Sequence, residues 1–318
     1  MASPDGVFEN DPVALTDMLG SSMAEFYIKD CKEPRLIHAA VLLAQSSEFF
    51  FMSSLKERDA LRDVAIKHGY SVEKDAFLWS EVDAESFGCF VQFLYTSQYS
   101  ENTVDLDPEP YITHASFHGQ CLLGDGETVA EESRVRLSFL ASRKYLRKHF
   151  SGNYFKDASD DPELLRRFML ESQGNYRDKM SRNMAMFVFG SGYRFHLLRD
   201  LATFYMQRTL FNMVCCDQRV EEVIDVILDF YEPPIRYGEY EPDEAGTEGR
   251  MSVTLAHFAA FNAEAFFKNW RFHRVLFYES FRELFYRAVE ERNTAISRNE
   301  IEQPKAWIRR PEHLFGGS

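Results

Sequence analysis

Residues 37–51 read Ile-His-Ala-Ala-Val-Leu-Leu-Ala-Gln-Ser-Ser-Glu-Phe-Phe-Phe, and residues 87–99 read Phe-Gly-Cys-Phe-Val-Gln-Phe-Leu-Tyr-Thr-Ser-Gln-Tyr. The first run turns into an apolar helical repeat and breaks at two serines. In the second run, apolar residues from Phe87 to Leu94 recur at i, i+3, i+4 and i+7, which is typical of one apolar helix face. Neither run carries an active-site motif. Together they predict a scaffold that binds other proteins.

Strand and turn signals around these runs predict a small mixed α/β domain. A β-forming segment at 25–29 is followed by turn residues at 30–34, so the chain is expected to return as the second strand of a hairpin. Asp83 stands where a helix N-cap is needed. The predicted elements are strands at 25–29, 35–37 and 76–79, and helices at 13–19, 39–44 and 84–95.

Two polar stretches divide the rest of the chain. The first is a breaker-rich entry of acids and prolines that opens an insert at 101–181. The second, at 231–249, has acids and prolines against the single Arg236, as expected of an acidic linker. Helical patterning is expected at 135–150, 162–170, 184–189, 195–213, 220–230 and 253–289. The predicted organisation is an N-terminal segment at 1–20, a domain at 21–230 that contains the insert, the linker, a helical region at 250–295 and a polar tail at 296–318.

The composition argues against several classes of protein. The formal net charge is −14, whereas nucleic-acid binding needs clustered Lys and Arg, so direct nucleic-acid binding is not expected. No apolar run approaches the ~20 residues of a membrane span, so we expect no membrane partner. The odd number of cysteines and a polar, acidic start in place of a secretory leader favour a reduced intracellular compartment, nuclear or cytoplasmic.

The order of strand, turn, strand, helix, strand and helix resembles the BTB/POZ domain. The later motif of that family, F-x-x-F-V/L-x-F-L-Y-T-x-x-Y, is matched over residues 87–99, and residues 188–202 are similar to its following helix pair. The long insert and the aromatic C-terminal helices make the chain similar to fungal BTB proteins. The earlier family motif, H-x-x-V-L-x-x-x-S-x-x-F, is matched by His38, Val41, Leu42, Ser46 and Phe49.

The resemblance implies an α/β (α+β) fold in which a short sheet is flanked by helices, with a mostly helical insert and C-terminal extension. It also implies a non-enzymatic adaptor or scaffold subunit that homodimerises or assembles a larger complex, for example a chromatin- or transcription-related one. A substrate adaptor of a cullin-type ubiquitin ligase is the alternative, and an enzyme with a site built by the insert is the alternative from another class. The surfaces carried over from the family would use Val13, Leu15, Met18 and Leu19 with the first helix for the dimer. For a cullin they would use the loop after Thr96, with Tyr99, and the helix beginning near Met184.

Few residues have the spacing of a chemical site. His114, His118 and Cys121 lie at i, i+4 and i+7, which would place three zinc ligands on one helix face, but Gly119 and β-forming neighbours argue against a helix there. We therefore expect no metal site. His38 begins a helix in the resembled fold and is expected to be structural. No phosphate loop, dinucleotide fingerprint or nucleophile elbow occurs in the sequence, so no cofactor is expected.

Two further clusters have simple structural interpretations. The adjacent Cys215 and Cys216 lack the spacing of a C-x-x-C motif and are expected to be helical core cysteines. The basic residues of 143–148, together with Tyr145 and Phe150, could touch nucleic acid or an acidic partner. On an acidic chain they are more often a solvated helix face that pairs with neighbouring acids.

Aromatic residues crowd the C-terminal helical region. Their spacing along 275–289 predicts an amphipathic helix. They either pack on the chain's own helices or form a partner-binding face, because aromatic residues and Arg dominate interface hot spots. Both alternatives stay open at this point. The candidate interface residues in this region are Phe266, Phe267, Trp270, Phe277, Phe281 and Phe285.

Overall fold

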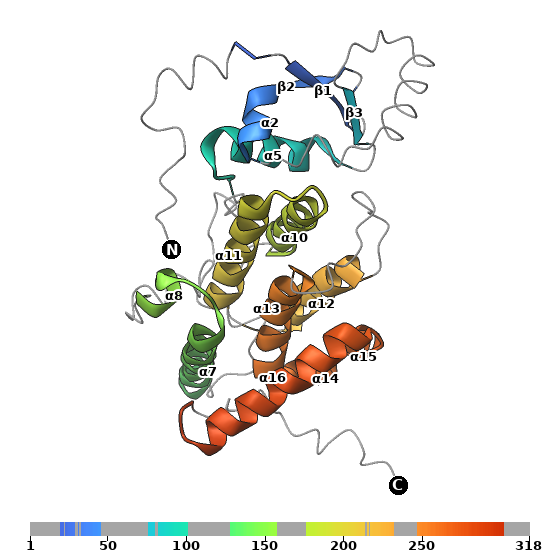
Figure 1. The fold of residues 1–318 in the computed structure, drawn as a ribbon. Coiled ribbons are helices and arrows are strands. Elements are labelled where there is room, and N and C mark those ends of the chain that lie inside the picture. Colours follow the sequence, from blue (N-terminus) through green and yellow to red (C-terminus); the bar gives the residue numbers. More distant parts are fainter. Residues whose placement is uncertain are drawn as a thin grey trace. The chain divides into compact units, whose positions relative to one another are not determined.

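The computed structural model describes residues 20–21, 23–28, 31, 33–45, 76–79, 82–100, 128–157, 176–213, 215, 217–231 and 247–301. These residues are mostly helical, with one three-stranded sheet (Figure 1). The strands are β1 (Met23–Ile28), β2 (Arg35–His38) and β3 (Ala76–Trp79). The helices are α2 (Ala39–Gln45), α5 (Ala84–Thr96), α7 (Thr128–His149), α8 (Asn153–Asp157), α10 (Tyr176–Gly192), α11 (His196–Asn212), α12 (Asp217–Tyr231), α13 (Thr247–Phe261), α14 (Ala263–Lys268), α15 (Trp270–Val275) and α16 (Glu279–Ser297).

The chain forms two compact units. Unit 1 comprises residues 1–102, 181–205 and 233–247, and unit 2 comprises residues 103–180, 206–232 and 248–318. The boundary near residue 102 coincides with the predicted start of the insert. Residues 206–232 belong with the insert and the C-terminal helices, whereas the sequence pattern had assigned the chain up to residue 230 to the N-terminal domain.

The sheet of unit 1 has the strand order β2-β1-β3. β1 pairs with β2 antiparallel, with Met23 opposite His38, and with β3 parallel, with Ile28 opposite Trp79. Burial alternates along β1, where Phe26 and its second neighbours are buried, as the two-residue period of a strand requires. The predicted hairpin and the predicted strand at 76–79 are both confirmed.

Helix α5 packs on this sheet through aromatic rings. The ring of Trp79 lies 4.6 Å from that of Phe26 and 5.4 Å from that of Phe90, and Phe26 also lies 5.5 Å from Phe87. Leu94 completes the buried face of α5. The predicted apolar stripe is therefore confirmed at Phe87, Phe90 and Leu94, which join the helix to β1 and β3, whereas Val91 is only partly buried.

Asp83 caps α5, as the sequence predicts. Its Oδ1 accepts hydrogen bonds from the backbone N–H groups of Glu85 at 2.9 Å and Ser86 at 2.8 Å. Replacing Asp83 by alanine is expected to lower the free energy of unfolding by about 1 kcal/mol, because two first-turn N–H groups lose their acceptor. Denaturant unfolding of the full chain measures this loss. Asp83→Asn keeps a capping oxygen and should be nearly neutral, so an equal loss in both variants would contradict the capping role.

The end of α10 and the start of α11 approach each other closely in unit 1. Phe189 contacts Trp79 and Phe90, with ring centroids 4.6 and 4.5 Å apart. A Cβ atom on Gly190 would lie 2.8 Å from the backbone nitrogen of Arg199. Glycine at 190 therefore permits a backbone contact that alanine would obstruct.

Unit 2 is built around the helices from α12 to α16, with α7 and α8. One face of α12 is buried, and the phenylalanines of the following helices pack ring against ring. Helix α7 begins at Thr128, earlier than the predicted residue 135, and α16 continues to Ser297, beyond the predicted end of the helical region at 295. Cys215 lies between α11 and α12 rather than inside a helix, which corrects the expectation of a helical cysteine.

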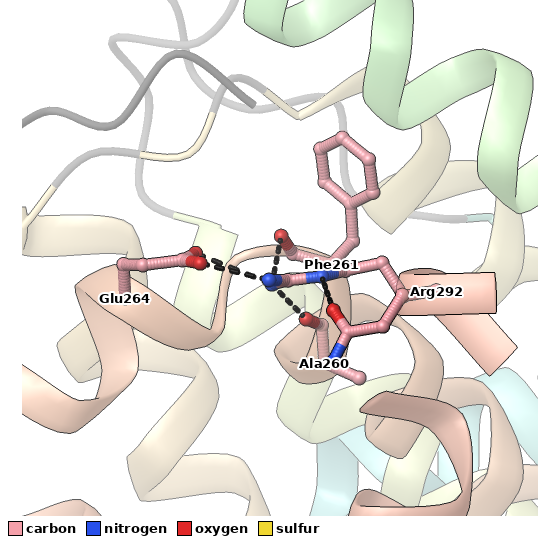
Figure 2. A network of polar contacts seen from close by, with 5 residues as sticks. Ala260, Phe261, Glu264 and Arg292 are labelled. Atoms are coloured by element: carbon pink, nitrogen blue, oxygen red, sulfur yellow. Dashed lines mark hydrogen bonds and ion pairs between the residues drawn. The ribbon is translucent and has the colours of Figure 1, made fainter. Parts of the chain in front are cut away.

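Arg292 links three helices of unit 2 (Figure 2). Its side chain is 8% exposed, and its guanidinium donates to the carbonyls of Ala260 at 2.8 Å and Phe261 at 3.2 Å. It also donates to the carboxylate of Glu264 at 2.8 Å. Ala260 and Phe261 end α13, so Arg292 supplies donors to carbonyl groups that have no partner within their own helix.

Several predictions lie outside the described residues. They include the helices at 13–19 and 162–170, most of the acidic linker, the segment around Ser46 and Phe49, and Cys216. None of the described helices is long and apolar enough to cross a membrane.

Candidate functional site

The most exposed apolar side chains of the described residues lie on the C-terminal helices. Phe277 is 80% exposed and Trp270 is 76% exposed. Phe267 and Tyr286 are roughly half exposed. We call these four residues the aromatic surface. Exposed apolar side chains that gather in one patch mark interaction sites, so these four residues are candidates for a binding surface.

A break between two short helices turns these rings outward. Asn269 ends α14, and its Oδ1 accepts a hydrogen bond from the backbone N–H of Arg271 at 3.0 Å, which starts α15. This change of direction leaves Phe266 inside and Trp270 outside. Phe277 lies in the short connection between α15 and α16 and belongs to neither helix.

A buried phenylalanine cluster supports the aromatic surface. The ring of Phe272 lies 5.1 Å from those of Phe266 and Phe285, and Phe285 lies 5.6 Å from Phe267. Phe266, Phe281 and Phe285 are fully buried in the chain itself, so these three candidates belong to its core and do not face a partner. The sequence grouped them with the exposed rings because all share one aromatic-rich segment.

The charge around the aromatic surface has a small basic excess, although the chain as a whole is acidic. Residues 263–286 contain Lys268, Arg271, Arg274 and Arg282 against Glu264, Glu279 and Glu283. Glu264 binds Arg292, and Arg271 binds Asp225 at 2.5 Å. Lys268, His273 and Arg274 are exposed. The exposed cations therefore lie on the same short helices as the exposed rings.

Of the predicted interface residues outside the C-terminal region, Tyr99 alone lies among the described residues, and it is buried. Tyr99 is 2% exposed, its hydroxyl donates to Asn183 Oδ1 at 2.9 Å, and its ring packs edge-on against Tyr205. Burial within unit 1 therefore excludes Tyr99 from a cullin-facing surface. Four further predicted interface residues and the three candidate zinc ligands lie outside the described residues: Val13, Leu15, Met18, Leu19, His114, His118 and Cys121.

His38 and the basic cluster have structural partners. The Tyr95 hydroxyl lies 2.8 Å from His38 Nδ1, which ties the start of α2 to α5. Arg143 is buried, donates to Asn212 at 2.9 Å and lies 4.1 Å over the ring of Phe211. Lys148 forms an ion pair with Glu300. Lys148 pairs with an acid, as predicted, whereas Arg143 is a core residue and is not part of a solvated face.

Three ionisable side chains from three different helices meet in unit 2, and the sequence did not indicate this. His149 ends α7, His257 lies in α13, and Glu291 lies in α16. The two imidazole rings stack with centroids 3.8 Å apart. Glu291 Oε2 lies 3.7 Å from His149 Nδ1 and 3.9 Å from His257 Nε2. No short motif could reveal the group, because its members belong to distant parts of the chain.

Tyr145 contacts the histidine cluster, which consists of His149, His257 and Glu291. Its buried hydroxyl lies 2.9 Å from His257 Nδ1 and donates to the carbonyl of Ala288 at 3.1 Å. On the opposite side, His149 and Glu291 line a pocket of about 460 Å³. The cluster therefore joins the interior of unit 2 to an open pocket.

Burial sets the protonation of the histidine pair. It lowers the pKa of His257 to about 3, with a further contribution from the neighbouring His149. Burial also lowers the pKa of His149, against the opposing effect of Glu291. Both imidazoles are therefore neutral near pH 7. The thiol of Cys89 is likewise kept protonated, because burial and then Asp83 raise its pKa to about 11.

No protein-family model matches the chain, and no match was found among curated proteins or among solved structures. The assignment of a function therefore depends on the geometry of the described residues and on the sequence motifs.

Proposed function

We propose that the chain is a non-enzymatic protein–protein interaction subunit that binds a partner through the aromatic surface. The observation that carries this proposal is the exposure of Trp270 and Phe277, at 76% and 80%. Burial of one such ring is worth about 1.5–3 kcal/mol. Trp, Tyr and Arg are also the residues most enriched among interface hot spots.

The chemistry around the rings specifies the partner. Lys268 and Arg274 are exposed beside them, so the matching surface is a protein segment with apolar side chains flanked by carboxylates. The net charge of the whole chain does not oppose this match, because charges beyond about 8 Å are largely screened at physiological ionic strength. The buried phenylalanines beneath the surface keep the rings in place, which lowers the entropy cost of binding.

The scaffold in this proposal is a BTB/POZ-like domain. What supports it is the order β1, β2, α2, β3 and α5, together with the motif residues at His38 and 87–99. Such a subunit would work inside the cell, in the nucleus or the cytoplasm, within a chromatin- or transcription-related assembly. Membership of a cullin ligase is the competing assignment.

Substitution of the exposed rings tests the proposal. Trp270→Ala and Phe277→Ala should each weaken binding to the partner by a factor of about 30 or more, with folding unchanged. The full chain and both variants are used as baits in the native host, captured proteins are compared by quantitative mass spectrometry, and the affected partner is purified for titration. Raising the salt concentration should weaken its binding, because the partner is acidic.

Leu197→Ala is the matched control, since Leu197 is an exposed apolar side chain of unit 1. Partners that depend on the aromatic surface should persist with this variant. Equal retention of every partner by Trp270→Ala, Phe277→Ala and Leu197→Ala would refute the proposal. If all of them captured a cullin equally, the ligase assignment would be favoured instead. If the purified chain bound anionic lipid vesicles through Trp270, the surface would be assigned to a membrane and not to a protein partner.

A further inference from the structure

We propose that unit 2 contains a zinc site formed by His149, His257 and Glu291. The three ligand atoms lie within 4.8 Å of one another, and they come from three helices that pack together. Two imidazole nitrogens and one carboxylate oxygen form a donor set that zinc prefers. This site is independent of the aromatic surface and shares no residue with it.

The ligand atoms lie too far apart for hydrogen bonds and somewhat farther apart than in a formed zinc site. Glu291 Oε2 lies 3.7 Å from His149 Nδ1 and 3.9 Å from His257 Nε2, and both separations exceed hydrogen-bond length. Ligand atoms at about 2.0–2.1 Å from one tetrahedral zinc ion lie roughly 3.3 Å apart. Rotation of the half-exposed Glu291 side chain, together with turning of the His149 ring out of its stack with His257, would bring the three atoms to that spacing.

Tyr145 selects the tautomer of His257 in which Nε2 can bind a metal. The tyrosine hydroxyl has one proton, which it donates to the carbonyl of Ala288. The 2.9 Å contact with His257 Nδ1 is then a hydrogen bond in which the imidazole donates and the hydroxyl accepts. His257 Nε2 therefore carries a lone pair, and this lone pair faces the carboxylate of Glu291. Support of a ligating imidazole through its other nitrogen is the usual arrangement in metal sites.

Two electron-pair donors that face each other across almost 4 Å can be bridged by a cation or by a water molecule. Neither His257 Nε2 nor the carboxylate of Glu291 has a proton to share, so a metal ion satisfies both. The lysine nearest in sequence, Lys148, is engaged with Glu300. A zinc ion in this position would also be held by His149, the third member of the group.

The pocket beside the site indicates an open coordination position. Three protein ligands leave the fourth position of a tetrahedral zinc ion for water or another small ligand. His149 and Glu291 line the pocket, whereas His257 does not, so that position opens toward it. Arg287 and Arg298 line the pocket together with Glu290 and Glu300, so water is the simplest fourth ligand.

Metal titration of the full, tag-free chain tests the proposal. After chelator treatment, ZnCl₂ is added in competition with a chromogenic chelator, and CoCl₂ is added to record the visible absorption of tetrahedral Co²⁺. One equivalent of each ion should bind. Glu291→Gln and His149→Ala should reduce the affinity by more than 100-fold, and Tyr145→Phe should reduce it by about 10- to 100-fold, the range typical of residues that support a metal ligand.

Three matched variants should bind zinc like the unchanged chain. Glu290→Gln alters a neighbouring carboxylate of the same pocket, and His196→Ala removes an exposed histidine of unit 1. The triple variant His114→Ala, His118→Ala, Cys121→Ala removes the ligands suggested by sequence spacing. Absence of binding, binding unchanged in both Glu291→Gln and His149→Ala, or binding abolished by the triple variant would each overturn the proposal. Glu291 and His149 are partly exposed, so both variants should fold even if Tyr145→Phe does not.

Discussion

Arg292→Met is expected to lower the free energy of unfolding by about 3–5 kcal/mol, a magnitude typical of breaking a buried charged network. Methionine keeps much of the apolar bulk but removes the donors to the carbonyls of Ala260 and Phe261 (Figure 2). Each buried carbonyl that loses its partner costs about 1–3 kcal/mol. Glu264 contributes less to the loss, because its partly exposed carboxylate can be hydrated once Arg292 is gone.

Denaturant unfolding of the full chain, followed by circular dichroism, measures this effect. Glu264→Gln should cost less than Arg292→Met, since the two carbonyl contacts remain. Arg282→Met is the matched control: Arg282 lies on the same helix, is much more exposed, and pairs only with Glu279 among the acids that the structure describes. Its effect should stay within about 0.5 kcal/mol. Similar losses for Arg282→Met and Arg292→Met would show that the buried network has no special role.

Phe285→Ala is expected to destabilise the chain by about 3–5 kcal/mol, the usual cost of truncating a buried phenylalanine. Phe285 is fully buried, and its ring contacts those of Phe267, Phe272 and Phe281. Deleting it leaves a cavity among rigid aromatic neighbours that can collapse only in part. The exposed rings would then lose the buried side chains that pack beneath them.

Comparison with Trp270→Ala separates core from surface in this aromatic segment. Trp270→Ala should change the free energy of unfolding by no more than about 0.5 kcal/mol, because its ring is 76% exposed. Thermal or denaturant unfolding of the two variants gives the difference directly. A comparable loss in both would mean that Trp270 is packed in solution, and this would also remove the basis for the aromatic surface.

Local features of the fold were predictable because neighbouring residues determine them. Asp83 bonds to N–H groups two and three positions away, so the cap of α5 can be recognised from a short stretch. The apolar stripe from Phe87 to Leu94 likewise follows from the helical period. The hairpin of β1 and β2 depends only on two strand-forming segments and the turn residues between them.

The aromatic segment was predicted only in part. Sequence identified Phe267, Trp270 and Phe277, but it could not separate them from the buried Phe266 and Phe285. One helical period over the whole segment assumes one continuous helix, whereas Asn269 and the connection before α16 interrupt it. Each interruption resets which side chains face the core.

Contacts between segments that lie far apart in the sequence could not be predicted from it. Arg143 belongs to a basic stretch that suggests a solvated face, yet it is buried because α11 provides Asn212 and Phe211 as partners. The histidine cluster is a similar case, since Tyr145 and His257 are separated by 112 positions. Residue type alone indicates neither the burial of a cation nor the meeting of three ligands.

The interleaved composition of the two units affects the order in which the chain can fold during synthesis. Each unit takes three separate stretches of sequence, and the unit boundaries at 180/181 and 205/206 fall inside α10 and α11. Domains made from one continuous stretch can fold as they leave the ribosome, N-terminal part first. Here the sheet of unit 1 must wait for Phe189 and its neighbours, and Tyr145 must wait for His257 and Ala288. Apolar residues of each unit therefore stay without their packing partners until the later stretches of that unit have been made.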